Sequence, residues 1–212
     1  MSSSSPEWFM SNDLSPVPAE PDLVALVGSR LCHDLISPLG AIGNGVELIS
    51  MTGAAGGPEI EMIAQSVAAA NARIRFFRLA FGRATDQPVG RGEIVSMLSE
   101  YGRDGRTRYL WQPEGEQPRR LVKLALLAVL CIEPALPRGG EIRVSTAEGR
   151  WTVRGEARQT RNDPGLWAHL DDNGTDALSP AQVQFALLPR EARAAGRSVG
   201  WALDDTSAEI RF

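Results

Sequence analysis

Two consecutive stretches of this chain repeat apolar residues at helical spacing across residues 22–84. In the first stretch the steps are three or four residues throughout, which is typical of one face of an α-helix: Val24, Val27, Leu31, Leu35, Leu39, Ile42, Val46 and Ile49. The second stretch alternates the same steps as a heptad seam does: Ile60, Ile63, Val67, Ala70, Ile74, Phe77 and Phe81. The glycine-rich segment 52–58 between them predicts a turn. The pattern therefore predicts an antiparallel helical hairpin.

A hairpin of two such helices cannot cover both of its apolar faces. Helices of this kind usually complete a four-helix bundle, and a second copy of the chain is the simplest source of the other two. We therefore predict a homodimer built on residues 22–84. The alternative is that the second half of the chain covers the exposed face.

One side of the first helix carries side chains suited to chemistry. At about 100° per residue, His33 points well away from Leu31 and Leu35, which face the core. The residues that share its side form what we call the His33 stripe: Arg30, His33, Ser37, Gly40 and Asn44.

The stripe contains a nucleophile, hydrogen-bonding groups and a cation. A neutral imidazole is a competent nucleophile at cellular pH. We expect Asp34 to accept a hydrogen bond from Nδ1–H of His33 and so present Nε2 to an incoming phosphorus atom. We expect Arg30 to neutralise phosphoryl oxygens and Ser37 to hold a phosphoryl oxygen or a water. Phosphoryl transfer depends mostly on such positioning and charge stabilisation, so these four are the candidate catalytic residues.

Three glycines, Gly40, Gly43 and Gly45, lie within the same predicted helix. Each costs roughly 1 kcal/mol relative to alanine, so a packing or functional reason is expected. Gly40 lies on the His33 side, where a missing side chain would let another protein approach the backbone. Gly40 and Asn44 are therefore candidate partner-binding residues, and close packing against the second helix is the alternative for the glycine.

The run from His33 to Pro38 reads His-Asp-Leu-Ile-Ser-Pro and resembles the H-box of dimeric bacterial sensor histidine kinases. The wider stretch 29–48 is similar to the ChpT-type histidine phosphotransferases of alphaproteobacteria. That resemblance implies a dimer that is phosphorylated at His33. It also implies transfer between the receiver domain of a hybrid histidine kinase and downstream response regulators, with Mg²⁺ supplied by the receiver.

The second half of the chain predicts an α+β domain with helices on one face of a mainly antiparallel sheet. The expected helices cover residues 92–101, 118–132 and 180–195, and the expected strands cover 108–112, 141–147, 150–157, 198–203 and 208–212. We place a flexible tail at residues 1–20, the hairpin domain at 21–85 and the α+β domain at 86–212.

The α+β domain resembles the GHKL, or Bergerat, ATPase-like sandwich of histidine kinases, notably at residues 137–144. In that resemblance the magnesium-binding asparagines fall at Leu127 and Cys131, whose side chains cannot supply hard oxygen ligands. The strand that should end in the adenine site reads Val-Arg-Gly-Glu-Ala at residues 153–157, and the Asp-Asp-Asn-Gly at 171–174 comes too late and reads as a turn. We therefore predict a degenerate domain without ATP, cofactor or metal.

Arginines follow the end of the second helix and the linker after it: Arg73, Arg75, Arg78, Arg83 and Arg91. Because receiver active sites are acidic, Arg75 and Arg78 are candidate docking residues. A solvated helix face is the alternative for each of them. We interpret His169, the other histidine, as structural.

Composition and charge narrow the possible partners and cellular location of the protein. A net charge of -4 argues against non-specific nucleic-acid binding. The N-terminus lacks the features of a secretory signal, and the longest apolar run, 124–132, is too short to span a bilayer. We expect a cytoplasmic protein without nucleic-acid or membrane partners. A histidine phosphotransferase is the leading interpretation, and the alternatives are a divergent histidine kinase or phosphatase and a non-enzymatic dimeric scaffold.

Overall fold

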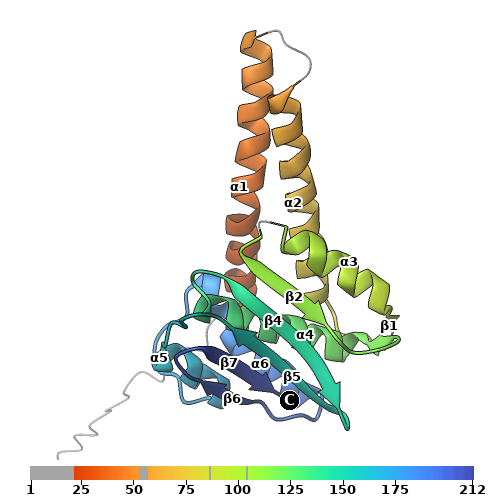
Figure 1. Ribbon diagram of the computed structural model, residues 1–212. Coiled ribbons are helices and arrows are strands. Elements are labelled where there is room, and N and C mark those ends of the chain that lie inside the picture. Colours follow the sequence, from red (N-terminus) through yellow and green to blue (C-terminus); the bar gives the residue numbers. More distant parts are fainter. Residues whose placement is uncertain (1–21, 53–56, 86, 104) are drawn as a thin grey trace, which may run out of the picture.

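Two long antiparallel helices stand on an α+β unit (Figure 1). The computed structural model describes residues 22–52, 57–85, 87–103 and 105–212. Helix α1 spans Leu23–Thr52 and helix α2 spans Pro58–Ala80. The predicted tail at 1–20 and most of the predicted turn at 52–58 lie outside the described residues. The hairpin itself is confirmed.

Local signals explain where the two helices begin. The Asp22 carboxylate accepts hydrogen bonds of 3.1 Å from the backbone N–H groups of Val24 and Ala25, which caps α1. Pro58 opens α2, where its missing N–H is harmless, and Glu59 follows in the first turn. Both helix starts were therefore readable from the chain.

A glycine sets how closely the two helices approach. A Cβ on Gly45 would lie 2.5 Å from Cγ1 of Ile63, so the buried Gly45 lets α2 pack directly against the α1 backbone. Close packing is thus the reason for the glycine at this position.

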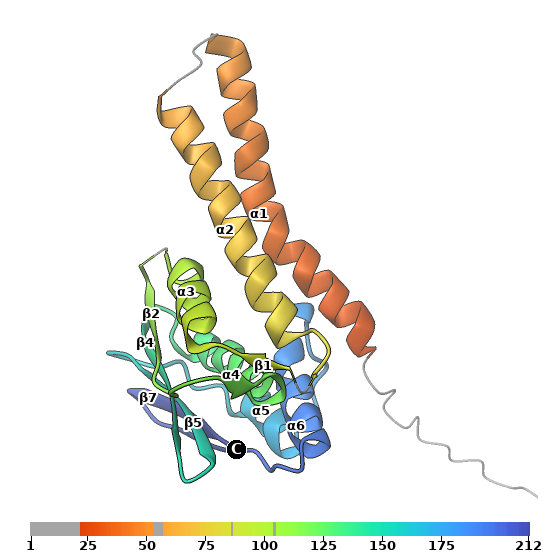
Figure 2. The ribbon, with the colours of Figure 1, turned by 90° about the vertical axis from the view of Figure 1, so that its right-hand side faces the viewer.

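The α+β unit is a five-stranded sheet with helices on one face (Figure 2). The strand order is β2-β4-β5-β7-β6; β2 and β4 are parallel and the other neighbours are antiparallel. The strands are β2 (Thr107–Trp111), β4 (Gly140–Ala147), β5 (Arg150–Glu156), β6 (Gly200–Leu203) and β7 (Ser207–Arg211). The covering helices are α3 (Arg91–Tyr101), α4 (Arg119–Ile132) and α6 (Val183–Ala194). The predicted α+β class is confirmed.

Small elements complete the unit, and the sequence had not indicated several of them. Strands β1 (Pro88–Val89) and β3 (Gln117–Pro118) form a short antiparallel pair, and α5 covers Pro164–Trp167. Three 3₁₀ helices follow other elements: η1 (Glu133–Ala135), η2 (Ala168–Asp171) and η3 (Pro180–Gln182). The helix expected from residue 180 therefore begins as η3, behind a Ser179 capping box, before it becomes α6.

The hydrophobic core is centred on α4, in which every residue from Val122 to Ile132 is buried. The chain's one lysine, Lys123, is buried there and pairs with Glu191 of α6 at 2.7 Å. The end of α2 enters the same core: Phe76 and Phe77 are buried, and Phe76 stacks on Tyr101 with ring centroids 4.2 Å apart. The core thus joins the hairpin to the α+β unit. None of the helices within the described residues is long and apolar enough to cross a membrane.

Candidate functional site

His33 stands out from α1 into solvent, with 81% of its side chain exposed. Leu31 is half-buried and packs against the core of the α+β unit, so it fixes the rotation of this part of the helix. The predicted orientation of His33, away from the apolar face, matches the structure.

Asp34 lies beside the imidazole and is mostly shielded. Its Oδ1 is 3.0 Å from Nδ1 of His33, and its side chain is 19% exposed. A carboxylate at this distance favours the ring tautomer with the proton on Nδ1, which leaves the lone pair on Nε2. The arrangement therefore presents Nε2 as the nucleophilic atom.

Arg30 does not lie on the exposed stripe as expected. Only 12% of its side chain is exposed. Its Nε donates to Asp34 Oδ2 at 2.6 Å, and its Nη1 donates to the backbone carbonyl of Ala181 in η3. The helical wheel placed Arg30 on the correct side of α1, but the guanidinium turns toward the α+β unit. Its predicted contact with phosphoryl oxygens stays a prediction, and this placement does not favour it.

The rest of the His33 stripe is open. Ser37, Gly40 and Asn44 are exposed, and a Cβ on Gly40 would have nothing within 4 Å. Packing against α2 therefore explains Gly45 and not Gly40. Pro38 is buried, and its lack of an N–H leaves the Asp34 carbonyl without its usual helical partner.

A half-buried acid lies near Arg30 and Asp34, and the sequence patterns described above did not single it out. Glu133 follows α4 directly and accepts hydrogen bonds from Tyr109 at 2.7 Å and Tyr101 at 3.4 Å. Burial raises the pKa of its carboxyl, while the Tyr109 hydrogen bond and the charge of Arg30 act in the opposite direction. The sequence signal for Glu133 is that an acidic residue directly follows the apolar run 124–132.

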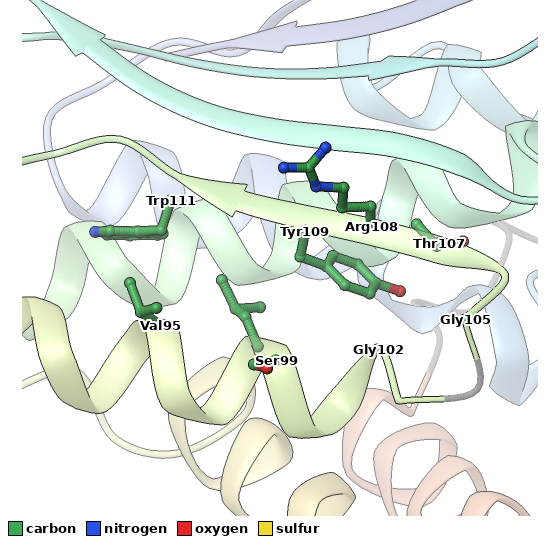
Figure 3. Close-up of a pocket in the computed structure, with 9 residues that line it drawn as sticks. Val95, Ser99, Gly102, Gly105, Thr107, Arg108, Tyr109 and Trp111 are labelled. Carbon is green, nitrogen blue, oxygen red and sulfur yellow. The ribbon is translucent and has the colours of Figure 1, made fainter.

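A separate groove lies in the α+β unit. It has a volume of about 420 Å³ and runs between α3 and β2, where Val95, Tyr109 and Trp111 line it (Figure 3). Its lining residues include none from α1 or α2. It is therefore not part of the His33 stripe.

The positions that resemble an ATP site are occupied by core side chains. Leu127 and Cys131 are fully buried, and burial raises the pKa of the Cys131 thiol. In the segment 171–174, Asp171 accepts a hydrogen bond from Trp201, and Asp172 pairs with Arg193. A cavity near the end of α4, lined by Ala135, Arg161, Trp167 and Gln182 among others, has a volume of about 180 Å³. Ligand pockets are usually about 300 Å³ or larger.

The candidate docking arginines lie on α2. Arg75 pairs with Glu100 and so connects α2 to α3. Arg78 is exposed, and its backbone carbonyl accepts a hydrogen bond of 3.3 Å from Arg119. Among the described residues, no group of three or more His, Cys, Asp or Glu side chains is placed to hold a metal ion.

Comparison with known proteins adds three findings. The family model described as the histidine phosphotransferase C-terminal domain matches residues 91–207. The protein phosphotransferase ChpT of Brucella abortus (strain 2308) is 38% identical over 184 residues, which cover 81% of this chain and 87% of that protein. A solved structure described as a bacterial phosphotransferase superposes with a TM-score of 0.74 at 29% identity, covering 92% of this chain and 98% of the other.

The half-buried Glu133 carboxyl leads to a prediction about stability. Because its pKa is raised above the ordinary 4.5 in the folded protein, the folded state binds this proton more tightly than the unfolded state does. The contribution of Glu133 to the free energy of unfolding therefore falls as the pH rises from 4.5 through the raised pKa. We expect Glu133→Gln to remove this decline, as urea unfolding at a series of pH values would measure. The exposed Glu116→Gln should leave the decline in place, and a curve for Glu133→Gln parallel to wild type would contradict the assignment.

Proposed function

Because this chain belongs to the histidine phosphotransferase family, and is a protein phosphotransferase of phosphorelay signalling, we propose that His33 is its phosphoryl carrier. His33 accepts the phosphoryl group from one receiver-domain aspartate and passes it to another. The observation that carries the proposal is the exposed imidazole whose Nδ1 is held by a shielded carboxylate.

The arrangement supports a direct transfer. The Nε2 lone pair attacks the phosphorus of an aspartyl phosphate; the N–P bond forms while the aspartyl O–P bond breaks, and the aspartate leaves with the electron pair. The Nδ1 proton stays on the ring, where Asp34 stabilises the developing positive charge. Transfer to the second receiver is the reverse of these steps. We expect the receiver's acidic site to bring Mg²⁺, and Ser37 to hold a phosphoryl oxygen.

A labelling experiment tests the carrier. Incubated with a phosphorylated receiver, the protein should acquire acid-labile label, and His33→Ala should acquire none because no other imidazole has this setting. His169→Ala is the matched control: His169 packs against Gly174 in the α+β unit and should not be needed for labelling. Undiminished labelling of His33→Ala would refute the proposal and favour a scaffold.

We propose that receivers dock along the exposed stripe that runs from His33 toward the tip of the hairpin, on Gly40 and Asn44, with Arg75 and Arg78 as further contacts. Support comes from the open surface at Gly40, where no neighbour fills the space of a side chain. Positive charge on α2 complements the acidic receiver and favours encounter.

A bulky side chain at Gly40 should therefore slow transfer by about tenfold or more, because it holds the receiver's phosphoryl group away from Nε2. Gly28→Leu is the control, because Gly28 also has open space and points about 140° away from His33. Transfer rates at matched protein concentrations would measure the effect. Equal rates for Gly40→Leu and Gly28→Leu would remove Gly40 from the docking surface.

We propose that the protein works as a homodimer whose hairpins form a four-helix bundle. Seven large apolar residues of the hairpin are 41–67% exposed: Ile36, Leu39, Val46 and Leu48 on α1 and Ile60, Val67 and Ile74 on α2. The three on α2 are seven residues apart, which is the spacing of a coiled-coil seam. The α+β unit leaves this face uncovered.

A charge in that seam should separate the subunits. We expect Val67→Glu to shift the protein from dimer to monomer in sedimentation velocity, because a carboxylate buried between apolar side chains is strongly unfavourable. Val95→Glu is the control, since Val95 on α3 is similarly exposed and lies outside the hairpin. A dimer that survives Val67→Glu and Leu39→Glu together would place the interface elsewhere.

We propose that the α+β unit binds no ATP and that the protein acts in the cytoplasm, without membrane or nucleic-acid partners. The burial of Leu127 and Cys131 supports the first statement, because core side chains stand where magnesium ligands would be needed. Measurable ATP affinity of the purified protein would favour the alternative, a divergent histidine kinase or phosphatase.

A further inference from the structure

The base of α1 is hydrogen-bonded to the α+β unit by a fully buried amide. Gln184 of α6 has no exposed surface, and its Nε2 donates to the carbonyls of Leu130 at 3.1 Å and Ala181 at 3.0 Å. Leu130 belongs to the core helix α4, so the amide is fixed by the most buried part of the molecule. Its position is therefore set by the fold of the α+β unit.

Arg30 connects this amide to the His33 stripe. Its Nη1 donates to the same Ala181 carbonyl and lies 3.4 Å from Oε1 of Gln184, while its Nε donates to Asp34 Oδ2 at 2.6 Å. Both ends of the guanidinium are thus used. An ion pair that is this well shielded holds its geometry better than an exposed one.

Asp34 passes the constraint to the imidazole. One carboxylate oxygen contacts Arg30 and the other lies 3.0 Å from His33 Nδ1. His33 itself is largely surrounded by solvent, so little else in this chain restrains its ring. A carboxylate that orients an imidazole fixes both the tautomer and the direction of the second nitrogen.

We propose that the α+β unit holds His33 in its reactive tautomer and orientation through the chain Gln184–Arg30–Asp34, with Gln184 and Arg30 as positioning residues. The proposal rests on the proposed role of His33 as the phosphoryl carrier. It assigns a purpose to a domain whose resemblance is to an ATPase. The domain acts on the hairpin as a fixed support, and it does so without nucleotide.

Gln184→Met tests the chain, because methionine keeps the length of the side chain and removes the amide. We expect about tenfold slower transfer at saturating phospho-receiver, with unchanged half-saturation, since orientation is lost and docking is not. In ¹⁵N-histidine NMR of the unphosphorylated protein, the His33 ring should lose its preference for the Nδ1–H tautomer. Arg193→Gln is the control: it removes the exposed Arg193–Asp172 pair from the same helix and should change neither readout.

The outcomes separate the two proposals. A folded Gln184→Met variant with the wild-type tautomer ratio overturns the positioning chain even if His33 carries phosphate. The chain is also overturned if this variant needs more phospho-receiver for half-maximal transfer but keeps the maximal rate of the wild type. If Gln184→Met does not fold, Arg30→Met cuts the same chain at its solvent side, and a wild-type tautomer ratio in that variant overturns the positioning chain equally. The NMR readout needs no phosphate. A wild-type protein that acquires no phosphoryl label from a phosphorylated receiver would therefore refute the carrier role and leave the positioning chain to be judged by NMR.

Discussion

The burial of the last turns of α2 is the interaction on which the rest of the structure depends. Phe76, Phe77 and Ala80 lie in the same core as α4, and Phe76 stacks on Tyr101 of α3. That contact joins the hairpin to the core of the α+β unit. With it, α1 is held beside η3 and α6, and the Arg30 side chain can reach the Ala181 carbonyl. The position of His33 relative to the α+β unit thus depends on an aromatic contact made by a different helix.

Solvent exposure is distributed unevenly across the site, in a way that suits a carrier of phosphoryl groups. The proposed carrier role requires two different proteins to reach His33, and its side chain is open to solvent. Asp34 and Arg30 are shielded beside it, where an ion pair is less screened by water. Gly40 leaves free surface on the tip side of His33, whereas Ile63 fills the space beside Gly45 on the same helix. Two glycines of one helix therefore have different surroundings.

Much of this architecture was predictable because local sequence patterns determine it. The three-and-four spacing predicted α1 and α2. The strands expected at 141–147 and 150–157 left two residues between them, and these, Glu148 and Gly149, form the β4–β5 turn with positive φ angles of 51° and 77°. The short β1–β3 pair was not predictable, because two residues per strand carry no alternation. The three glycines of α1 were ambiguous for a different reason. The sequence showed that each lowers helix stability, and only the positions of Ile63 and Met62 showed that Gly45 is the packed one.

By itself, the sequence determined that His33 projects away from the apolar face of a long helix with an acid beside it, since helical periodicity is a property of the backbone alone. Only the tertiary structure decided where Arg30 points and that the half-buried Glu133 lies near it. Arg30 and Ala181 are 151 residues apart, and a flexible side chain takes its direction from whichever partners the packing of distant segments brings within reach. A helical wheel contains no information about those partners.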